Sequence, residues 1–398
     1  MAKMKLFALI LALMLVLSAC GSAAAPVETA APTAAPTEAP TEAPTEPPLV
    51  KEVFTWEDMQ DINHTEKNVN FNNIDYSKQP HFTNQLGMRD YFLSCLSNRC
   101  RNILFSCDKK AMPSITGSAF CDEYKLAWCN PKMEPGDNGI HYMISVTYYP
   151  GDNVAWAYLN NDTSTLTDDE LVLYEAAVNW LAENITEEMT DLEKCTVIYE
   201  YLAGNVQYST ELLNALNTSY TFDLGITAYG AMIDNVTICQ GYADAFDMLT
   251  SMLGMNCVQT TGTANGPHNW NTIELDGNWY HVDCTWGAAF GGVDGKCSWA
   301  YFMASDGQLG RTHSWNHEIT PKADDDSLFY YTYHDLYVTN EEELNSKVGT
   351  ALAEGAEQVD VYVKNLTMKQ VKDYVEGIGA QYRVTEYQGD VILCAWME

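Results

Sequence analysis

The dipeptide Asp276-Gly277 lies between two apolar segments, and it constrains the fold more than any other local feature of the sequence. Asp-Gly suits a two-residue hairpin loop, because both loop positions need the positive φ angles that these residues tolerate. Segments 269–275 and 278–285 are therefore expected to pair as antiparallel strands, with the residues that flank the loop facing each other.

This register decides which side chains share a face of the sheet. It places His268 opposite Thr285 and diagonal to Asp283. Side chains alternate between faces, so His268 and Asp283 are expected on the same face, roughly 7–8 Å apart as diagonal neighbours. A shift of one residue would put them on opposite faces. The loop thus predicts that a histidine and a carboxylate can meet.

Helices are predicted before this hairpin, where apolar positions recur at helical spacing. Thr190 and Glu193 form the capping-box pattern that starts a helix, and Gly254 is placed to end another with a left-handed cap. The predicted helices cover 168–184, 191–202 and 239–252, and an additional strand covers 257–262. Helices followed by an antiparallel sheet indicate an α+β fold with the helices packed on the sheet.

Cys239 is the candidate nucleophile, because it stands at the expected start of a helix. The positive end of a helix and a nearby imidazolium both favour the thiolate, which is the reactive form of cysteine. His268 is the candidate base, and Asp283 is the carboxylate that would orient its ring. His281 is the rival histidine, since it shares the face of Asp283; its alternative role is structural.

Three ordered segments resemble the bacterial transglutaminase-like superfamily. They are 238–246 (Ile-Cys-Gln-Gly-Tyr-Ala-Asp-Ala-Phe), 268–271 (His-Asn-Trp-Asn) and 279–286 (Trp-Tyr-His-Val-Asp-Cys-Thr-Trp). The predicted helix 191–202, Tyr208 and the segment 301–306 (Tyr-Phe-Met-Ala-Ser-Asp) also resemble that family. The resemblance covers about residues 165–320 and implies a papain-like cysteine catalytic domain. Members of the family include acyltransferases, peptidases and inactive relatives.

The resemblance implies a catalytic triad of Cys239, His268 and Asp283, because it places the catalytic imidazole before Asn-Trp rather than at His281. The backbone N–H of Cys239 is an expected oxyanion donor at the helix start. The side-chain donor stays open. Four residues are candidates for the oxyanion site or the cleft, and the tryptophans are equally well explained as core: Gln240, Tyr229, Trp270 and Trp286.

Two classes of function follow from these residues. The first is thiol acyl chemistry on an amide, in which water gives a peptidase or amidase and an amine gives a transamidase. The second is a non-catalytic surface binding or scaffold protein that retains the domain, although an intact triad argues against it. No cofactor is expected. No metal is expected either, because no cysteine pair has the Cys-x-x-Cys spacing of zinc sites.

The amino terminus has the pattern of a secretory signal. Lys3 and Lys5 precede the uncharged apolar run 6–17, and small residues lie around Cys20. Residues 17–20 (Leu-Ser-Ala-Cys) resemble the bacterial lipobox, in which the cysteine thiol is acylated. Residues 20–50 are rich in Pro, Thr, Glu and Ala and have little to bury, which is typical of an extended tether. A lipid anchor on the outer face of the bacterial cytoplasmic membrane is therefore expected.

The net charge excludes some classes of partner, and the cysteine count bears on disulfides. A formal net charge of −33 disfavours nucleic acid and anionic lipid surfaces, which attract basic patches. A peptide, a protein or a cell-wall peptide is the expected substrate. Twelve cysteines include Cys20 and Cys239. The even remainder permits disulfides outside the cytoplasm but does not require them, since buried free cysteine is common.

The sequence divides into five parts. These are a signal peptide (1–19), a tether (20–50), an amino-terminal accessory domain (51–164), the catalytic domain (165–320) and a carboxy-terminal α/β module (321–398). Both flanking parts show a helix–strand–helix–strand order, which indicates a duplicated module. Expected elements are 86–97, 102–107, 117–128 and 140–149 in the first, and 341–353 (capped by Asn340), 359–363, 367–376, 381–387 and 391–396 in the second.

Acylation of Cys20 predicts where the mature chain is found. The wild-type protein should partition with membranes, and a Cys20→Ser variant should move to the soluble fraction, because the acyl chains supply the membrane affinity. Mass spectrometry of the amino-terminal peptide checks the modification directly. Cys239→Ser is the matched control and should stay with the membranes. Cleavage elsewhere, or an unmodified Cys20 in the wild type, would contradict the anchor.

Overall fold

The computed structural model describes residues 69–111, 128–219, 223–288, 296–317, 320–387 and 389–397. The chain divides into Met1–Leu49 and Val50–Glu398, and every described residue belongs to the second unit. The predicted signal peptide, Cys20 and the tether lie outside the described residues. Within the described ranges, no helix is long and apolar enough to cross a bilayer.

Three helices predicted from their apolar spacing frame the central domain. They are α5 (Asp168–Asn184), α6 (Asp191–Asn205) and α8 (Cys239–Met252). Thr190 and Glu193 form the predicted capping box at the start of α6, and Gly254 has the positive φ of 81° expected beyond the end of α8. Helix α8 is buried along nearly its whole length, so it forms the centre of the largest hydrophobic core.

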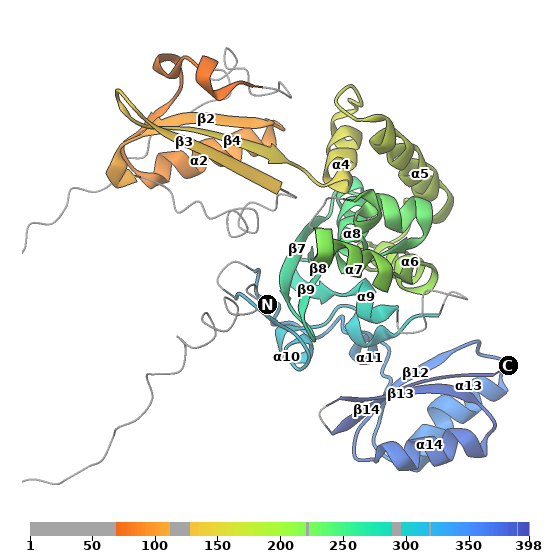
Figure 1. The fold of residues 1–398 in the computed structure, drawn as a ribbon. Coiled ribbons are helices and arrows are strands. Elements are labelled where there is room, and N and C mark those ends of the chain that lie inside the picture. The colour runs from red at the N-terminus through yellow and green to blue at the C-terminus, as the bar shows by residue number, and fades with distance from the viewer. Residues whose placement is uncertain are drawn as a thin grey trace, which may run out of the picture. The chain divides into compact units, whose positions relative to one another are not determined.

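The central sheet has the strand order β10-β7-β8-β9. Its strands are β7 (Asn256–Thr263), β8 (Pro267–Leu275), β9 (Asn278–Val282) and the short β10 (Ser314–Trp315). Figure 1 shows α8 against this sheet, and α8 makes most of its sheet contacts with β7 and β8. Helices packed on an antiparallel sheet confirm the predicted α+β class.

The predicted hairpin register is confirmed. Leu275 pairs with Asn278, and the two loop residues, Asp276 and Gly277, have φ angles of 52° and 81°. The last strand ends earlier than expected, at Val282 instead of 285. The reason is local: the Asp283 side chain accepts a hydrogen bond from a backbone N–H and caps the short helix α9 (Cys284–Gly287), which takes the place of the strand end.

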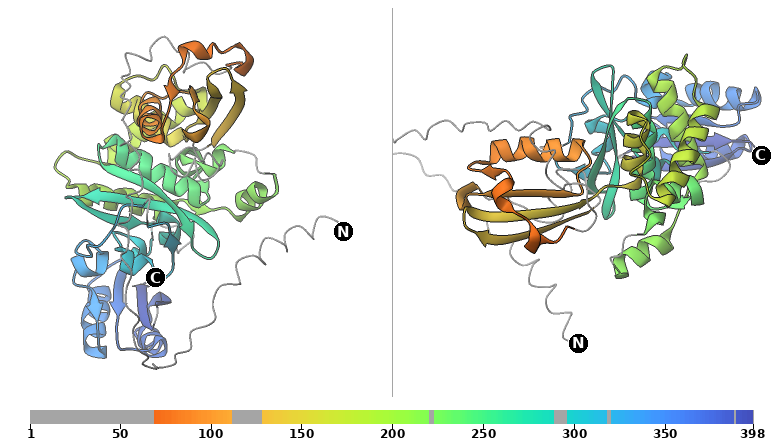
Figure 2. Two further views of the ribbon diagram at one scale, coloured as in Figure 1. Left: turned by 90° about the vertical axis from the view of Figure 1, so that its left-hand side faces the viewer. Right: turned by 90° about the horizontal axis from the view of Figure 1, so that it is seen from above.

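The amino-terminal module is a sheet of order β1-β2-β4-β3 with one described helix. Figure 2 shows the helix lying along one face of the sheet. Strands β2 and β4 and the helix were predicted; the helix and β4 each begin one residue earlier than expected, and β4 ends two residues earlier. The elements are β1 (His81–Phe82), α2 (Gln85–Ser97), β2 (Asn102–Cys107), β3 (Trp128–Gly136) and β4 (Gly139–Thr147).

One prediction for this module is wrong in part. A helix was expected at 117–128. Residues 117–127 lie outside the described residues, and Trp128 is the first residue of strand β3. The sequence pattern did not predict β3, because this strand contains Pro131 and Pro135 and proline argues against a central strand. Strand β3 pairs only with β4 in the described sheet, and an edge strand tolerates proline.

The carboxy-terminal module matches the sequence prediction closely. Asn340 caps a helix that runs through a π-helical turn, and every predicted strand is present with bounds within one residue. Helices α13 and α14 cover one face of the sheet in Figure 1. The elements are β11 (Tyr337–Val338), α12 (Glu341–Leu344), η7 (Asn345–Gly349), α13 (Thr350–Ala353), β12 (Val359–Val363), α14 (Met368–Gly377), β13 (Gln381–Tyr387) and β14 (Asp390–Trp396).

The two flanking sheets share one topology. Their strand orders are β1-β2-β4-β3 and β11-β12-β14-β13. In each sheet the short first strand pairs parallel with its neighbour, and the other two neighbouring pairs are antiparallel. Each has its own hydrophobic core.

The remaining elements are η1 (Phe71–Asn73), η2 (Tyr76–Lys78), η3 (Lys109–Ala111), α4 (Pro150–Asn160), β5 (Gln207–Tyr208), α7 (Thr210–Ser219), η4 (Leu224–Ile226), η5 (Gly230–Asp234), β6 (Val236–Thr237), η6 (Trp299–Tyr301), α10 (Asp306–Leu309) and α11 (Tyr330–Tyr333).

Candidate active site

Cys239 is the first residue of α8, as the sequence predicted. The first backbone N–H groups of a helix have no partner inside the helix, so they face outward at this end. Gly241 lets another segment pass close to the same turn, because a Cβ there would collide with Thr237 Oγ1 and the Thr227 carbonyl. The half-buried thiol of Cys239 therefore sits on a helix start that its neighbours hold in place.

His268 and Asp283 meet across the hairpin, on the face that the register requires. His268 Nε2 lies 2.8 Å from Asp283 Oδ2. Both side chains are buried, with exposed fractions of 6 % and 0 %. Burial alone would lower the pKa of His268, but the Asp283 carboxylate raises it to about 10, and Cys239 adds to the rise. The carboxylate thus favours the imidazolium form of His268, and it bonds to Nε2 of the ring.

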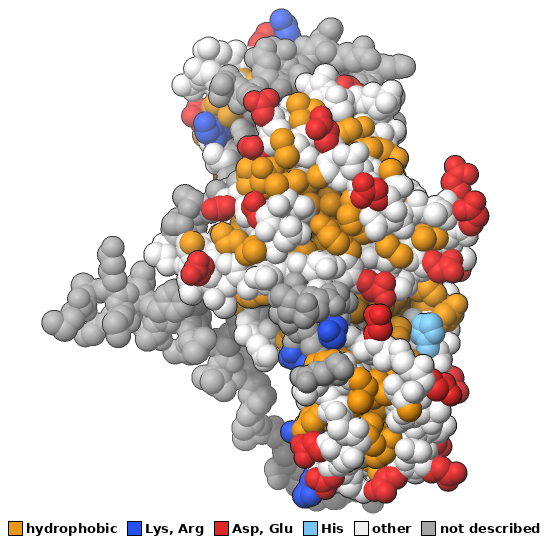
Figure 3. All heavy atoms as spheres, turned by 90° about the vertical axis from the view of Figure 1, so that its right-hand side faces the viewer, with side chains coloured by type: hydrophobic (Ala, Val, Ile, Leu, Met, Phe, Trp, Pro, Cys, Tyr) orange, Lys and Arg blue, Asp and Glu red, His pale blue; other side chains and the backbone are white. Residues whose placement is uncertain are grey.

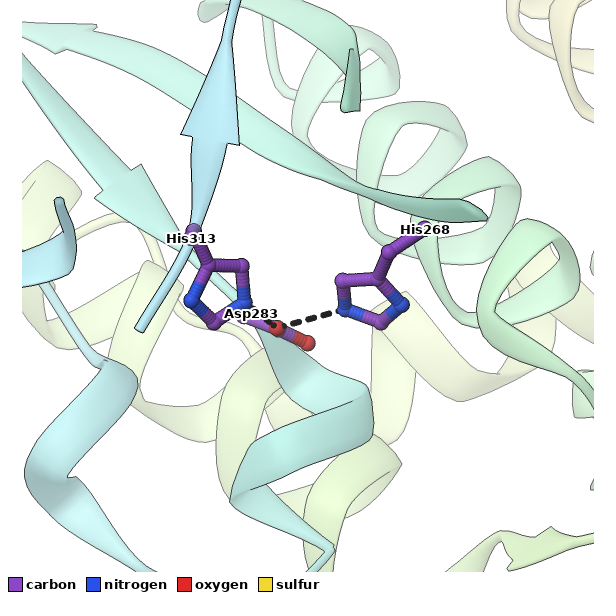
Figure 4. Close-up of side chains that lie close together, drawn as sticks. All are labelled: His268, Asp283 and His313. Atoms are coloured by element: carbon purple, nitrogen blue, oxygen red, sulfur yellow. Dashed lines mark hydrogen bonds and ion pairs between the residues drawn. The ribbon is translucent and has the colours of Figure 1, made fainter. Parts of the chain in front are cut away.

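A second histidine, His313, shares the same carboxylate. Its Nε2 lies 2.9 Å from Asp283 Oδ2, so one oxygen accepts hydrogen bonds from two imidazoles, as Figure 4 shows. The other oxygen, Oδ1, accepts the backbone N–H of Trp286 at 3.0 Å. Burial alone would raise the pKa of Asp283, but His268 and His313 hold it well below its usual value.

The sequence analysis did not find His313. It lies 30 residues beyond Asp283, next to a strand of only two residues, and no motif surrounds it. The nearby segment 301–306 gave an indirect signal. Its backbone bonds to β9, with the Asp283 N–H donating to the Tyr301 carbonyl at 2.9 Å, and the chain then turns through α10 to His313.

His281, the rival histidine, is fully buried beneath the site. Its Nδ1 accepts a hydrogen bond from Trp270 Nε1 at 3.1 Å, so the proton of the neutral ring is on Nε2, which donates to Asp306 Oδ1 at 2.9 Å. Burial lowers the pKa of His281, and the bond to Asp306 offsets only part of this change. A structural role therefore fits His281.

A cavity of about 930 Å³ opens over Cys239 and His268. Trp286, one of the predicted cleft residues, lines it, and so does Tyr208. Trp270 and Tyr229 are not among the described residues that line the cavity. Trp270 is buried under His268, with ring centroids 5.8 Å apart, and Tyr229 packs against the central core. Trp270 is better explained as a core residue because its side chain is fully buried, and the half-buried Tyr229 packs against that core.

Gln240 lines the cavity, but its amide is committed to its neighbours. Its Nε2 donates to Gln259 Oε1 at 2.8 Å, and its Oε1 accepts a bond from the Asn269 side chain. Gln259 in turn donates to Asp247 Oδ2 at 3.4 Å. These bonds tie the start of α8 to strands β7 and β8, so Gln240 orients the nucleophile helix against the histidine strand.

Among the described residues, one group could hold a metal ion. The ligand atoms of His268, Asp283 and His313 lie within 4.8 Å of one another. The same atoms already form the hydrogen bonds that orient His268. A metal bound there would replace those bonds and take the base away from the thiol. All ten cysteines in the described ranges are free thiols, and none belongs to this group.

Comparison with known proteins gives the family of this region. Residues 179–284 match the transglutaminase-like superfamily. This chain carries a transglutaminase-like domain. The matched range includes Cys239, His268 and Asp283 and ends before His313.

Individual relatives match over short stretches. The kyphoscoliosis peptidase of Mus musculus is 26 % identical over 131 residues, which is 29 % of this chain and 19 % of that protein. The kyphoscoliosis peptidase of Homo sapiens is 24 % identical over 121 residues, or 27 % and 18 % of the two chains. The matches thus span about a fifth of the length of these relatives. A crystal structure of a TGase covers 46 % of this chain and 50 % of its own, with 15 % identity and a TM-score of 0.25.

The pairs His268–Asp283 and His281–Asp306 allow a matched test. In Asp283→Asn, burial is no longer opposed by a negative charge, so the pKa of His268 should fall and the imidazolium should be lost near neutral pH. Alkylation of Cys239 at pH 6 should then slow about 100-fold or more, because the cation that stabilises the thiolate is gone. The measurement is the alkylation rate between pH 5 and 10, with circular dichroism to check the fold.

Asp306→Asn is the control for this prediction. It removes the carboxylate that pairs with His281, whose ring nitrogens bond to Trp270, Thr272 and Asp306, and should leave the alkylation rate of Cys239 within about twofold while lowering stability. Equal losses of reactivity in the two variants would show that Asp283 acts only through the fold.

Proposed function

We propose that this protein performs thiol acyl chemistry on amide bonds, as a peptidase or amidase or as a transamidase. One observation carries the proposal: a buried His268–Asp283 pair at 2.8 Å faces the cavity that Cys239 lines. This is the order of groups that a nucleophilic cysteine needs, with the base beside the thiol and the carboxylate behind the base.

The residues fit a two-stage reaction. The Cys239 thiolate attacks the amide carbon, and a tetrahedral oxyanion forms. The carbon–nitrogen bond breaks as His268 gives its proton to the leaving amine, which leaves a thioester on Cys239. Water or a second amine then attacks the thioester, His268 takes a proton from it, and the acyl group leaves as the acid or as a new amide. Asp283 keeps the ring oriented in both stages.

Tyr208 is the proposed side-chain donor to the oxyanion. It lines the cavity on β5, whose pairing with β6 sets Tyr208 beside Thr237, two residues before the nucleophile. Burial, and then the neighbouring Cys239, raise the pKa of Tyr208, so its hydroxyl keeps the proton that it would donate. The amide of Gln240 is already bonded, which favours Tyr208 together with the backbone N–H of Cys239.

The outcome of the second stage and the cellular setting are also proposals. Hydrolysis is favoured over transamidation, because water is the most abundant nucleophile at a cell surface. A peptide, protein or cell-wall peptide is the proposed substrate, and an acylated Cys20 the proposed anchor at the outer face of the membrane. No metal or cofactor has a step in this reaction. The alternative, a surface binding protein without turnover, does not need a charged histidine beside a thiol.

Selective alkylation tests the proposed nucleophile. At pH 6, iodoacetamide should label Cys239 about 100-fold or more faster than Cys257, and a metal chelator should not change the rate. Cys257 is the internal control: it is also half-buried, but burial raises its pKa well above the ordinary value. His268 keeps its proton until the pH rises through about 10, so labelling should already be fast in mildly acidic solution. Equal rates, or loss of activity with the chelator and recovery with zinc, would refute the thiol mechanism.

Tyr208→Phe separates turnover from thiol reactivity. Removal of one oxyanion donor should lower kcat on a peptide amide by about 10²–10³-fold. Alkylation by iodoacetamide forms no oxyanion and should continue at the wild-type rate. Tyr229→Phe is the matched control and should change neither rate. A parallel loss of alkylation in Tyr208→Phe would mean that the phenol acts on the thiol instead.

A further inference from the structure

The carboxy-terminal module forms part of the wall of the catalytic cavity. Arg383 and Thr385 of β13 and Ile392 of β14 line the same cavity as Cys239 and His268. These three residues lie beyond the range that matches the transglutaminase-like superfamily. The cavity therefore has a wall that the catalytic sequence segments do not encode.

Alternation along the strands explains why this module faces the central domain. Val361 of β12 and Leu393 of β14 pack into the module's own core, against its helices. Tyr362 and Ile392, one position away on the same strands, belong to the core of the central domain. The two faces of one sheet thus serve two cores, because neighbouring side chains point in opposite directions.

Specific contacts hold this face in place. Gln358 Nε2 donates to the Cys297 carbonyl at 3.0 Å, and the rings of Tyr362 and Tyr331 lie 5.7 Å apart. The Arg311 guanidinium donates to the Tyr362 hydroxyl. Strand β13 is next to β14 at the edge of the sheet, with Thr385 opposite Ile392 in the ladder. Arg383 lies two residues earlier on β13 and therefore shares the face of Thr385.

The charge of the cavity differs from that of the chain. The chain has 54 acidic and 21 basic residues. Figure 3 shows the same excess on one face, where acidic side chains outnumber basic ones. Among the described residues that line the cavity there is no Asp or Glu, and Arg383 is the one Lys or Arg. Arg383 and the His268 cation are thus the charged groups among the described lining residues, and both are positive.

We propose that Arg383 forms a subsite for a carboxylate, so that the enzyme selects acyl donors that carry an acidic group beside the scissile amide. The inference rests on the proposed thiol chemistry. A planar guanidinium binds a carboxylate through two parallel hydrogen bonds, and Thr385 presents a hydroxyl on the same strand face. The described lining residues carry no carboxylate, so none of them repels an acidic substrate.

Matched electrophilic peptides test this subsite. Short peptides ending in a vinyl sulfone form a thioether with Cys239, and each is made with Glu or Gln at one position in turn. A further pair of probes carries a carboxylate or a carboxamide on the sulfone substituent. This pair tests the side of the cleft that would bind the leaving group. The second-order rate of Cys239 labelling is measured at low and high salt. The proteins are the wild type, Arg383→Gln, Arg383→Glu and the control Lys369→Gln, whose exposed charge lies on α14.

At one position, the acidic probe should label the wild type about tenfold or more faster than its amide, since a charge-assisted hydrogen bond is lost with the amide. Salt should reduce the preference. Arg383→Gln should abolish it without slowing the amide probe, Arg383→Glu should reverse it, and Lys369→Gln should keep it. Equal rates at every position, or a preference that survives Arg383→Gln, would overturn the subsite and leave the proposed chemistry standing. Failure of every probe to label Cys239 would remove both.

Discussion

The buried carboxylate of Asp283 is the group on which the central domain depends. A charge with no exposure to solvent must be matched by partners inside the protein, and an unpaired one costs about 3–5 kcal/mol. Three donors match this one: His268, His313 and the Trp286 backbone. They come from three different segments, so a single carboxylate holds strand β8, the approach to β10 and helix α9 together.

The same interaction favours the charged form of His268. Asp283 raises the pKa of His268 against the effect of burial, and it bonds to Nε2 of the ring. His281 of β9 pairs with the partly exposed Asp306 of α10, yet burial lowers the pKa of His281. The two pairs have similar distances but different surroundings, because His281 accepts a bond from Trp270 and has no thiol beside it. Environment, more than geometry, gives His268 and His281 opposite pKa shifts.

Local signals predicted much of this fold. The Asp276-Gly277 loop set the hairpin register, capping patterns set helix starts, and the ranges of α5, α8 and β12 were predicted without error. Features that depend on distant contacts were missed. His313 gains its place through a long-range bond, and Trp270 is buried in the core instead of lining the cleft. Strand β3 was not predicted because it contains prolines, which an edge strand tolerates. No pattern in the sequence showed that β13 would reach the cavity.

The separate core beneath β13 has a consequence for how such proteins diversify. The residues that bury β12–β14 against α13 and α14 belong to a cluster of their own, whereas the nucleophile helix belongs to another. Substitutions on the outer strand can therefore reshape one wall of the cleft while the machinery behind the thiol keeps its packing. Selection could explore new substrates by rewriting a few positions of β13, provided that Tyr362 and Ile392 of the same sheet keep their packing in the central core.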